Sequence, residues 1–177
     1  MVGRRSPSRL GFSLSELMVV LGIIMILVAI SIPVYVSSRM RANEVSTIAT
    51  LRTLHSAQQS YRRKNDEFGL IQELVDADLV DPNIDRRSRE KDGYEIYVRT
   101  RQKLSGRKTR DSWAAIAWPV SWGVSGDRMY LMTANGFLYQ TTEQEVSSRK
   151  EAQQYTKKGF FKDFRLEDIP KEFQKVE

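Results

Sequence analysis

The chain has 177 residues, a formal net charge of +6, one histidine and no cysteine. The lack of cysteine excludes a disulfide framework and a cysteine nucleophile, and a single histidine excludes zinc sites built from several histidines and cysteines. No G-x-S-x-G, H-E-x-x-H or P-loop pattern occurs, so we expect neither an enzyme nor a bound cofactor.

A basic leader, residues 1–11, precedes a long apolar segment. The leader carries three arginines and no acid, so a chain without it would keep a net charge of +3. No charged residue occurs from Leu17 to Val36. As a helix rising about 1.5 Å per residue, that stretch reaches roughly 30 Å, the thickness of a bilayer's hydrocarbon core. The segment is too long for the apolar core of a signal peptide, and Ser31-Ile32-Pro33 is a poor cleavage site.

Two interpretations remain for this segment. The first is an ordinary single-pass anchor, and the second depends on the order in which the leader, a glycine and the apolar run follow one another. A charged leader ends in Gly11 before the apolar run, an aromatic residue follows at Phe12, and an acid, Glu16, comes five residues after the glycine. Together with Pro33, these features make the stretch from Gly11 to about Tyr35 resemble the type IV pilins and type II secretion pseudopilins.

The resemblance implies a processing and assembly route. A prepilin peptidase would cut after Gly11, and Phe12 would become the N-methylated amino terminus. The chain would sit in a bacterial inner membrane as a single-pass protein, with its head outside the cytoplasm. It would then polymerise on an assembly platform, with other copies or related pilins, into a pilus or pseudopilus. The resemblance makes Phe12, Glu16 and Pro33 the assembly residues.

Glu16 has two compatible explanations. A carboxylate at the edge of hydrocarbon is costly and calls for a partner. The family resemblance supplies one, the amine of a neighbouring subunit's Phe12. The stretch Ser13-Leu14-Ser15-Glu16 also fits the capping box S-x-x-E, in which the acid reaches back to the amide of Ser13.

Pro33 lacks an amide hydrogen and crowds the carbonyl of Ala29, so we expect it to kink or loosen the helix. The chain departs from the family here. The glycine that often stands eight residues before this proline is Met25, and Gly22 lies three residues earlier.

After the apolar segment the pattern becomes amphipathic. Apolar residues recur at spacings of three or four, as on one side of a helix; they are Val45, Ile48, Leu51, Leu54, Ala57 and Tyr61. We therefore predict one helix from Phe12 to about Lys64, with a membrane half over 12–36 and an amphipathic half over 37–64. His55 lies beside the stripe, and without a second histidine or a cysteine we interpret it as a packed helix residue.

Residues 65–177 are predicted to form a globular α+β head. A short helix or a pair of turns should end by Asp81-Pro82, because a residue before proline is disfavoured in helical space. A charged loop, Arg86 to Lys91, follows. The strand candidates share β-forming residues: Tyr94–Arg99, Trp113–Trp118, Arg128–Thr133 and Gly136–Thr141.

We predict a pilin-like fold, in which an antiparallel sheet of three or four strands packs on the helix stripe and both bury their apolar faces. Asn135-Gly136 predicts a hairpin between the last two strands. The Trp113–Trp118 strand is apolar throughout and should be covered on both faces. Residues Glu143–Tyr155 have little apolar face and are expected to form a surface helix, and Lys157–Glu177 to be irregular.

Two further features invite a functional interpretation. Six basic residues and no acid occur from 99 to 110: Arg99, Arg101, Lys103, Arg107, Lys108 and Arg110. They would contact nucleic acid or an acidic partner, or would form an ordinary solvated loop, which is the interpretation we favour. Three tryptophans, Trp113, Trp118 and Trp122, would either bind a ligand or neighbour or, as we favour, form the core of the head.

The C-terminal carboxylates are the remaining candidates for a metal site. Asp163, Glu167 and Asp168 do not match the spacing of an EF-hand loop, so we expect no metal site.

The sequence thus predicts a structural subunit of a type IV pilus or secretion pseudopilus. The rival is a single-pass membrane-anchored, extracytoplasmic binding module that does not polymerise, with DNA as a candidate ligand. Pilus versus pseudopilus, and major versus minor subunit, stay open, although the absence of cysteine favours a pseudopilin or minor-pilin head.

Overall fold

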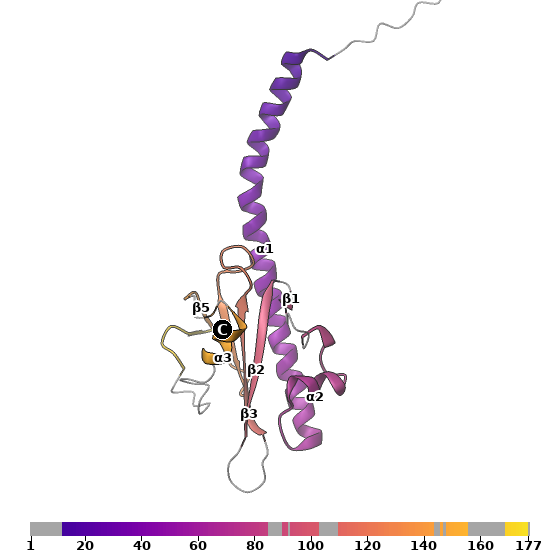
Figure 1. Ribbon diagram of the computed structural model, residues 1–177, viewed down its shortest axis with the longest axis vertical. Coiled ribbons are helices and arrows are strands. Elements are labelled where there is room, and N and C mark those ends of the chain that lie inside the picture. The colour runs from indigo at the N-terminus through magenta and orange to yellow at the C-terminus, as the bar shows by residue number, and fades with distance from the viewer. Residues whose placement is uncertain are drawn as a thin grey trace, which may run out of the picture. The chain divides into compact units, whose positions relative to one another are not determined.

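The computed structural model describes residues 12–84, 90–91, 93–102, 110–143, 146, 148–155 and 169–176. The chain divides into two compact units, one that ends at Ser37 and one from Ser38 to Glu177. The helices are α1 (Leu14–Asn65), α2 (Ile71–Asp76), the 3-10 helix η1 (Pro82–Ile84) and α3 (Arg149–Tyr155). The strands are β1 (Glu90–Lys91), β2 (Tyr94–Gln102), β3 (Arg110–Pro119), β4 (Met129–Thr133), β5 (Leu138–Thr141) and β6 (Gln174–Lys175) (Figure 1).

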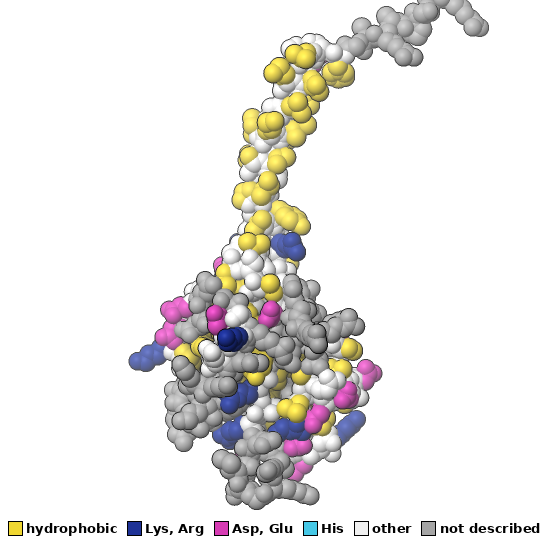
Figure 2. Space-filling view, viewed as in Figure 1, with side chains coloured by type: hydrophobic (Ala, Val, Ile, Leu, Met, Phe, Trp, Pro, Cys, Tyr) yellow, Lys and Arg dark blue, Asp and Glu magenta, His cyan; other side chains and the backbone are white. Residues whose placement is uncertain are grey.

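The predicted long helix is present as α1, which runs 52 residues and contains Pro33 without a break in its assignment. Within the first unit, every residue from Phe12 to Tyr35 is exposed, and apolar side chains follow one another along the helix (Figure 2). By length and composition, α1 can cross a membrane. In this unit of the single chain, no described side chain covers the apolar surface.

The sheet has six strands in the order β1-β2-β3-β4-β5-β6, and every neighbouring pair is antiparallel. The four longer strands coincide with the four predicted ones, and β4 and β5 form the expected hairpin, in which Gly136 has φ +81°.

Two short edge strands were not predicted. The loop expected over Arg86–Lys91 contains β1, which pairs with β2, and the tail expected to be irregular contains β6, which pairs with β5. Both strands are two residues long and polar, so they have no apolar alternation from which a strand could be recognised. They are held by backbone pairing at the two edges of the sheet.

The sheet is buried on both faces, as the apolar Trp113–Trp118 segment predicted. One face packs on α1; this cluster includes Leu51, Leu54, Ala57, Phe68, Leu74, Tyr94, Ile96, Trp113, Tyr130 and Met132. The other face forms a second cluster, made by Ala114, Ile116, Trp118, Met129, Leu131, Val146, Ala152 and Phe173. The predicted surface helix is shorter than expected, and Ala152 of α3 is fully buried in the second cluster.

The predicted stripe is correct in its centre and wrong at its start. Leu51, Leu54 and Ala57 are buried, whereas Val45 is 67% exposed. Glu44 and Thr47 occupy the buried face instead. The positions 44, 47, 51, 54 and 58 keep helical spacing, but a hydrophobicity pattern cannot find a face whose first members are polar.

Candidate assembly site

The N-terminus of α1 is capped by the side chain of Glu16. The backbone N–H of Ser13 donates to Oε2 of Glu16 at 2.9 Å, and the N–H of Leu17 donates to the carbonyl of Ser13 at 3.2 Å. This is the acid half of the predicted capping box. The Ser13 hydroxyl lies 2.7 Å from the hydroxyl of Ser15. In the single chain, Glu16 therefore satisfies one of the free amides at its own helix N-terminus.

The surroundings of Glu16 are apolar and open. Glu16 shares a shallow surface hollow with Phe12, Ser15, Val19 and Val20, and the side chain of Phe12 is 84% exposed. Gly11, the other predicted processing residue, lies outside the described residues. The arrangement presents one carboxylate at the edge of an uncovered apolar helix face, which can accept both a cation and another apolar helix.

The basic residues predicted as a nucleic-acid or partner surface are only partly described. Lys103, Arg107 and Lys108 fall in a stretch that the structure does not describe. Arg101 forms a bidentate ion pair with Asp111, in which Nε donates to Oδ1 at 3.1 Å and Nη2 donates to Oδ2 at 3.0 Å. Arg99 is half-buried on β2.

Arg110, the last member of that basic set, is buried in the head. Its guanidinium contacts Glu67 at 2.7 Å and Glu73 at 2.7 and 3.0 Å. Burial alone would lower the pKa of Arg110, but its hydrogen bonds to the two carboxylates raise it. The hydrogen bond from Arg110 lowers the pKa of Glu67. Arg110 thus joins β3 to α2 and to the segment after α1, and its charge is used inside the head.

A second set of polar contacts inside the head, made by Asn43 and Glu44, was not predicted from the sequence. Next to the start of the second unit, Asn43 Nδ2 donates to the carbonyl of Ser125 at 2.9 Å. The N–H of Asp127 donates to Glu44 at 3.3 Å, and Arg128 lies 3.6 Å from the other oxygen of Glu44. Burial raises the pKa of Glu44, and so does the side chain of Asp127, while the N–H bond from Asp127 opposes that rise. Two adjacent residues of α1 therefore hold the connection between β3 and β4, residues 120–128.

The aromatic residues are structural. Trp113 and Trp118 are almost fully buried, on opposite faces of the sheet, and half-buried Trp122 donates to the carbonyl of Val146 at 3.1 Å. The ring of His55 lies 6.0 Å from that of Trp113, and burial lowers its pKa. These positions confirm the predicted core role of Trp113 and Trp118 and the packed position of His55.

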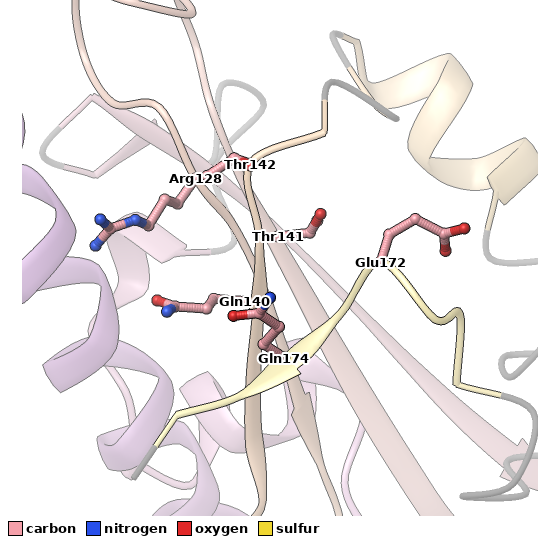
Figure 3. A pocket seen from close by; sticks show the side chains of 6 residues that line it. All are labelled: Arg128, Gln140, Thr141, Thr142, Glu172 and Gln174. Atoms are coloured by element: carbon pink, nitrogen blue, oxygen red, sulfur yellow. The ribbon is translucent and has the colours of Figure 1, made fainter.

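An open apolar hollow of about 490 Å³ lies on α1 within the head and is lined by Val45, Ile48, Ala49 and Arg52. A polar hollow of about 70 Å³ is lined by Arg128, Gln140, Thr141, Thr142, Glu172 and Gln174 (Figure 3). That volume holds about two water molecules. Among the described residues, no group of three or more His, Cys, Asp or Glu side chains is placed to hold a metal. Asp163, Glu167 and Asp168 lie outside those residues.

The fold and the N-terminal site together define a pilin-like protein: a long apolar N-terminal helix followed by an α+β head. Comparison with known proteins agrees. Residues 7–32 match the prokaryotic N-terminal methylation motif. The chain is also 37% identical over 67 residues to the type IV major pilin protein PilA of Myxococcus xanthus (strain DK1622). That match covers 38% of this chain and 30% of the PilA protein.

Proposed function

We propose that the chain is a structural subunit of a type IV pilus or secretion pseudopilus. It is made as a prepilin in the inner membrane, cut after Gly11, N-methylated at Phe12 and polymerised through the first half of α1. The observation that carries the proposal is the uncovered apolar half of α1 with Glu16 in its first turn, inside the matched methylation motif.

The energetics of the helix support two successive environments. Seventeen large apolar side chains between Phe12 and Tyr35 are exposed, and burial of such surface stabilises by about 25 cal/mol per Å². Lipid provides that burial before assembly, and copies of the same helix provide it afterwards. Pro33 fits both stages, because neighbouring helices can satisfy the carbonyl that it leaves free.

Glu16 gives the assembled state its register. Inside a bundle of apolar helices an ionised carboxylate needs a cation. In this proposal the cation is the new amino terminus of Phe12 from a neighbouring subunit. The hydrogen bond that Glu16 accepts from the Ser13 amide in the single chain does not oppose this role, because a carboxylate can accept several hydrogen bonds.

A non-polymerising anchored binding module is the rival. An anchor needs an apolar helix but needs neither a glycine–phenylalanine junction nor an acid four residues beyond it. The described basic residues do not favour DNA binding, because Arg101 and Arg110 are paired with carboxylates.

The mass of the chain in its native membrane tests processing. The proposal predicts a mature chain that lacks residues 1–11 and carries one extra methyl group. Gly11→Val should leave the full-length chain uncut. Gly22→Ala is the matched control, because a Cβ at Gly22 meets nothing within 4 Å, and it should be processed normally. A native chain that retains Met1 would contradict the proposal.

A further inference from the structure

The connection between β3 and β4 has an uncharged, partly apolar tip. Residues 120–126 read VSWGVSG. The side chains of Val120 and Val124 are 42% and 55% exposed, although almost every residue of the adjoining strand β3 is buried. An apolar pair held in solvent at the end of a buried strand has no role in the core of the head.

The tip is a turn held by several hydrogen bonds within residues 121–126. The N–H groups of Val124 and Ser125 donate to the carbonyl of Ser121 at 3.1 and 2.8 Å, and the Ser125 hydroxyl lies 3.0 Å from the Ser121 amide. The N–H of Gly123 donates to the carbonyl of Gly126 at 2.9 Å. Gly123 has φ +74°, which a glycine adopts at little cost. The two valines are therefore presented by a well-bonded scaffold.

The position of the tip along α1 relates it to the membrane. The uncharged run of the helix ends at Ser38, and Asn43, which holds the Ser125 carbonyl, comes five residues later. Five residues of helix correspond to about 8 Å, and the headgroup zone extends roughly 5–8 Å beyond the hydrocarbon on each side. Within the second unit, the loop lies beside α1, to which the hydrogen bond from Asn43 ties it (Figure 1).

The same turn of α1 carries positive charge. Arg39 and Arg41 are exposed in the interval between Ser38 and Asn43. Basic side chains at the end of a span are attracted to anionic headgroups. The apolar tip and the exposed arginines two and four residues before Asn43 on α1 together match a lipid surface. The valines suit the acyl boundary, and the guanidinium groups suit the phosphates.

We propose that residues 120–126 form a second membrane contact, which rests on the surface of an anionic bilayer while the subunit waits in the membrane. Val120 and Val124 enter the headgroup–acyl boundary, and Arg39 and Arg41 bind lipid phosphates. The contact fixes how the head stands on the membrane before assembly. The inference rests on the membrane-anchored state proposed above.

The absence of native cysteine allows a direct test on the full chain. Single cysteines replace Val124, Val28 in the span, and Ser56, which is exposed farther along α1 in the head. Each variant is labelled with an environment-sensitive fluorophore and reconstituted in phosphatidylcholine–phosphatidylglycerol vesicles with or without quencher-carrying lipid. Val120→Cys repeats the measurement at the second valine.

The expected result is strong quenching at position 28, intermediate quenching at 124 and 120, and none at 56. Replacement of Arg39 and Arg41 by glutamine should reduce quenching at 124 and leave it unchanged at 28. Quenching at 28 with none at 124 and 120 would overturn this inference and leave the proposed function standing. No quenching at 28 would overturn the membrane span and the inference together. A label at 124 that changes only when subunits assemble, without lipid quenching, would assign the tip to a neighbouring protein and also overturn it.

Discussion

Gln58 of α1 and Gly69 exchange two hydrogen bonds inside the head. Gln58 Nε2 donates to the carbonyl of Gly69 at 2.8 Å, and the N–H of Gly69 donates to Gln58 Oε1 at 2.9 Å. Gln58 is fully buried. The side chain therefore substitutes for a backbone partner and fixes the chain where it turns back along the helix.

Gln58→Leu should destabilise the head by about 2–4 kcal/mol, because it leaves a buried N–H and a buried carbonyl without partners. Chemical unfolding of the detergent-solubilised full chain measures the change. Gln72→Ala is the control, because Gln72 is exposed and its amide donates to Asp76 at 3.0 Å within α2. This substitution should change stability by less than about 0.5 kcal/mol. Equal losses in both variants would contradict the role given to Gln58.

Arg110→Met should cost about 2–4 kcal/mol, because it removes a buried cation that pairs with both Glu67 and Glu73. Arg101→Met removes an ion pair whose arginine side chain is 40% exposed, and it should cost less than about 1 kcal/mol. The same unfolding experiment compares the two. If Arg101→Met proved the more damaging substitution, the central place of Arg110 in the head would be wrong.

Glu44 and Glu67 should give opposite pH dependences. The pKa of Glu44 is raised above 4.5 in the folded chain, so its stabilising contribution is complete below 4.5 and is lost as pH rises through the folded pKa. The pKa of Glu67 is lowered below 4.5, so its contribution is present above 4.5 and is lost as pH falls. Asp127 and Arg128 face Glu44, with Tyr94 and Tyr130 nearby.

Relative to the unsubstituted chain, Glu44→Gln should therefore gain stability as the pH rises above 4.5. Glu67→Gln should instead gain stability, relative to the unsubstituted chain, as the pH falls below 4.5. Unfolding free energies from about pH 3 to about pH 7 measure both differences. Parallel slopes for the two variants would show that the environment of Glu44 does not disfavour its ionised form.

Two substitutions at Glu16 separate capping from assembly. Glu16→Gln keeps a side-chain acceptor for the Ser13 amide but removes the charge, whereas Glu16→Ala removes both. We expect both variants to insert in the membrane and both to lose most filament yield, because only the charge can pair with a neighbouring amine. Filaments sheared from cells measure the yield. Normal yield with Glu16→Gln and loss with Glu16→Ala would assign Glu16 to the helix cap alone.

Much of the fold follows from local pattern. The uninterrupted apolar run predicts the first half of α1, and Asn135-Gly136 predicts the hairpin, because each is encoded by neighbouring residues. The N-terminal site is also local, since Ser13 and Glu16 lie within one helical turn.

The buried polar contacts of Glu44 and Arg110 could not be predicted, because they depend on partners far along the chain. Glu44 contacts Asp127 and Arg110 contacts Glu67, and no periodicity links such positions. Glu44 was therefore missed on the buried face, and Arg110 was grouped with a basic loop although it is buried. The edge strands β1 and β6 depend in the same way on the strands beside them.

We expect α1 to exchange lipid for copies of itself after the leader is removed. The most direct measurement is the mass of this chain recovered from sheared surface filaments, or from a pseudopilus purified by its own assembly machinery. We expect the chain to be present there, to begin at Phe12 and to carry an N-terminal methyl group. A chain that starts at Met1 and occurs only as a single subunit in the membrane would contradict it.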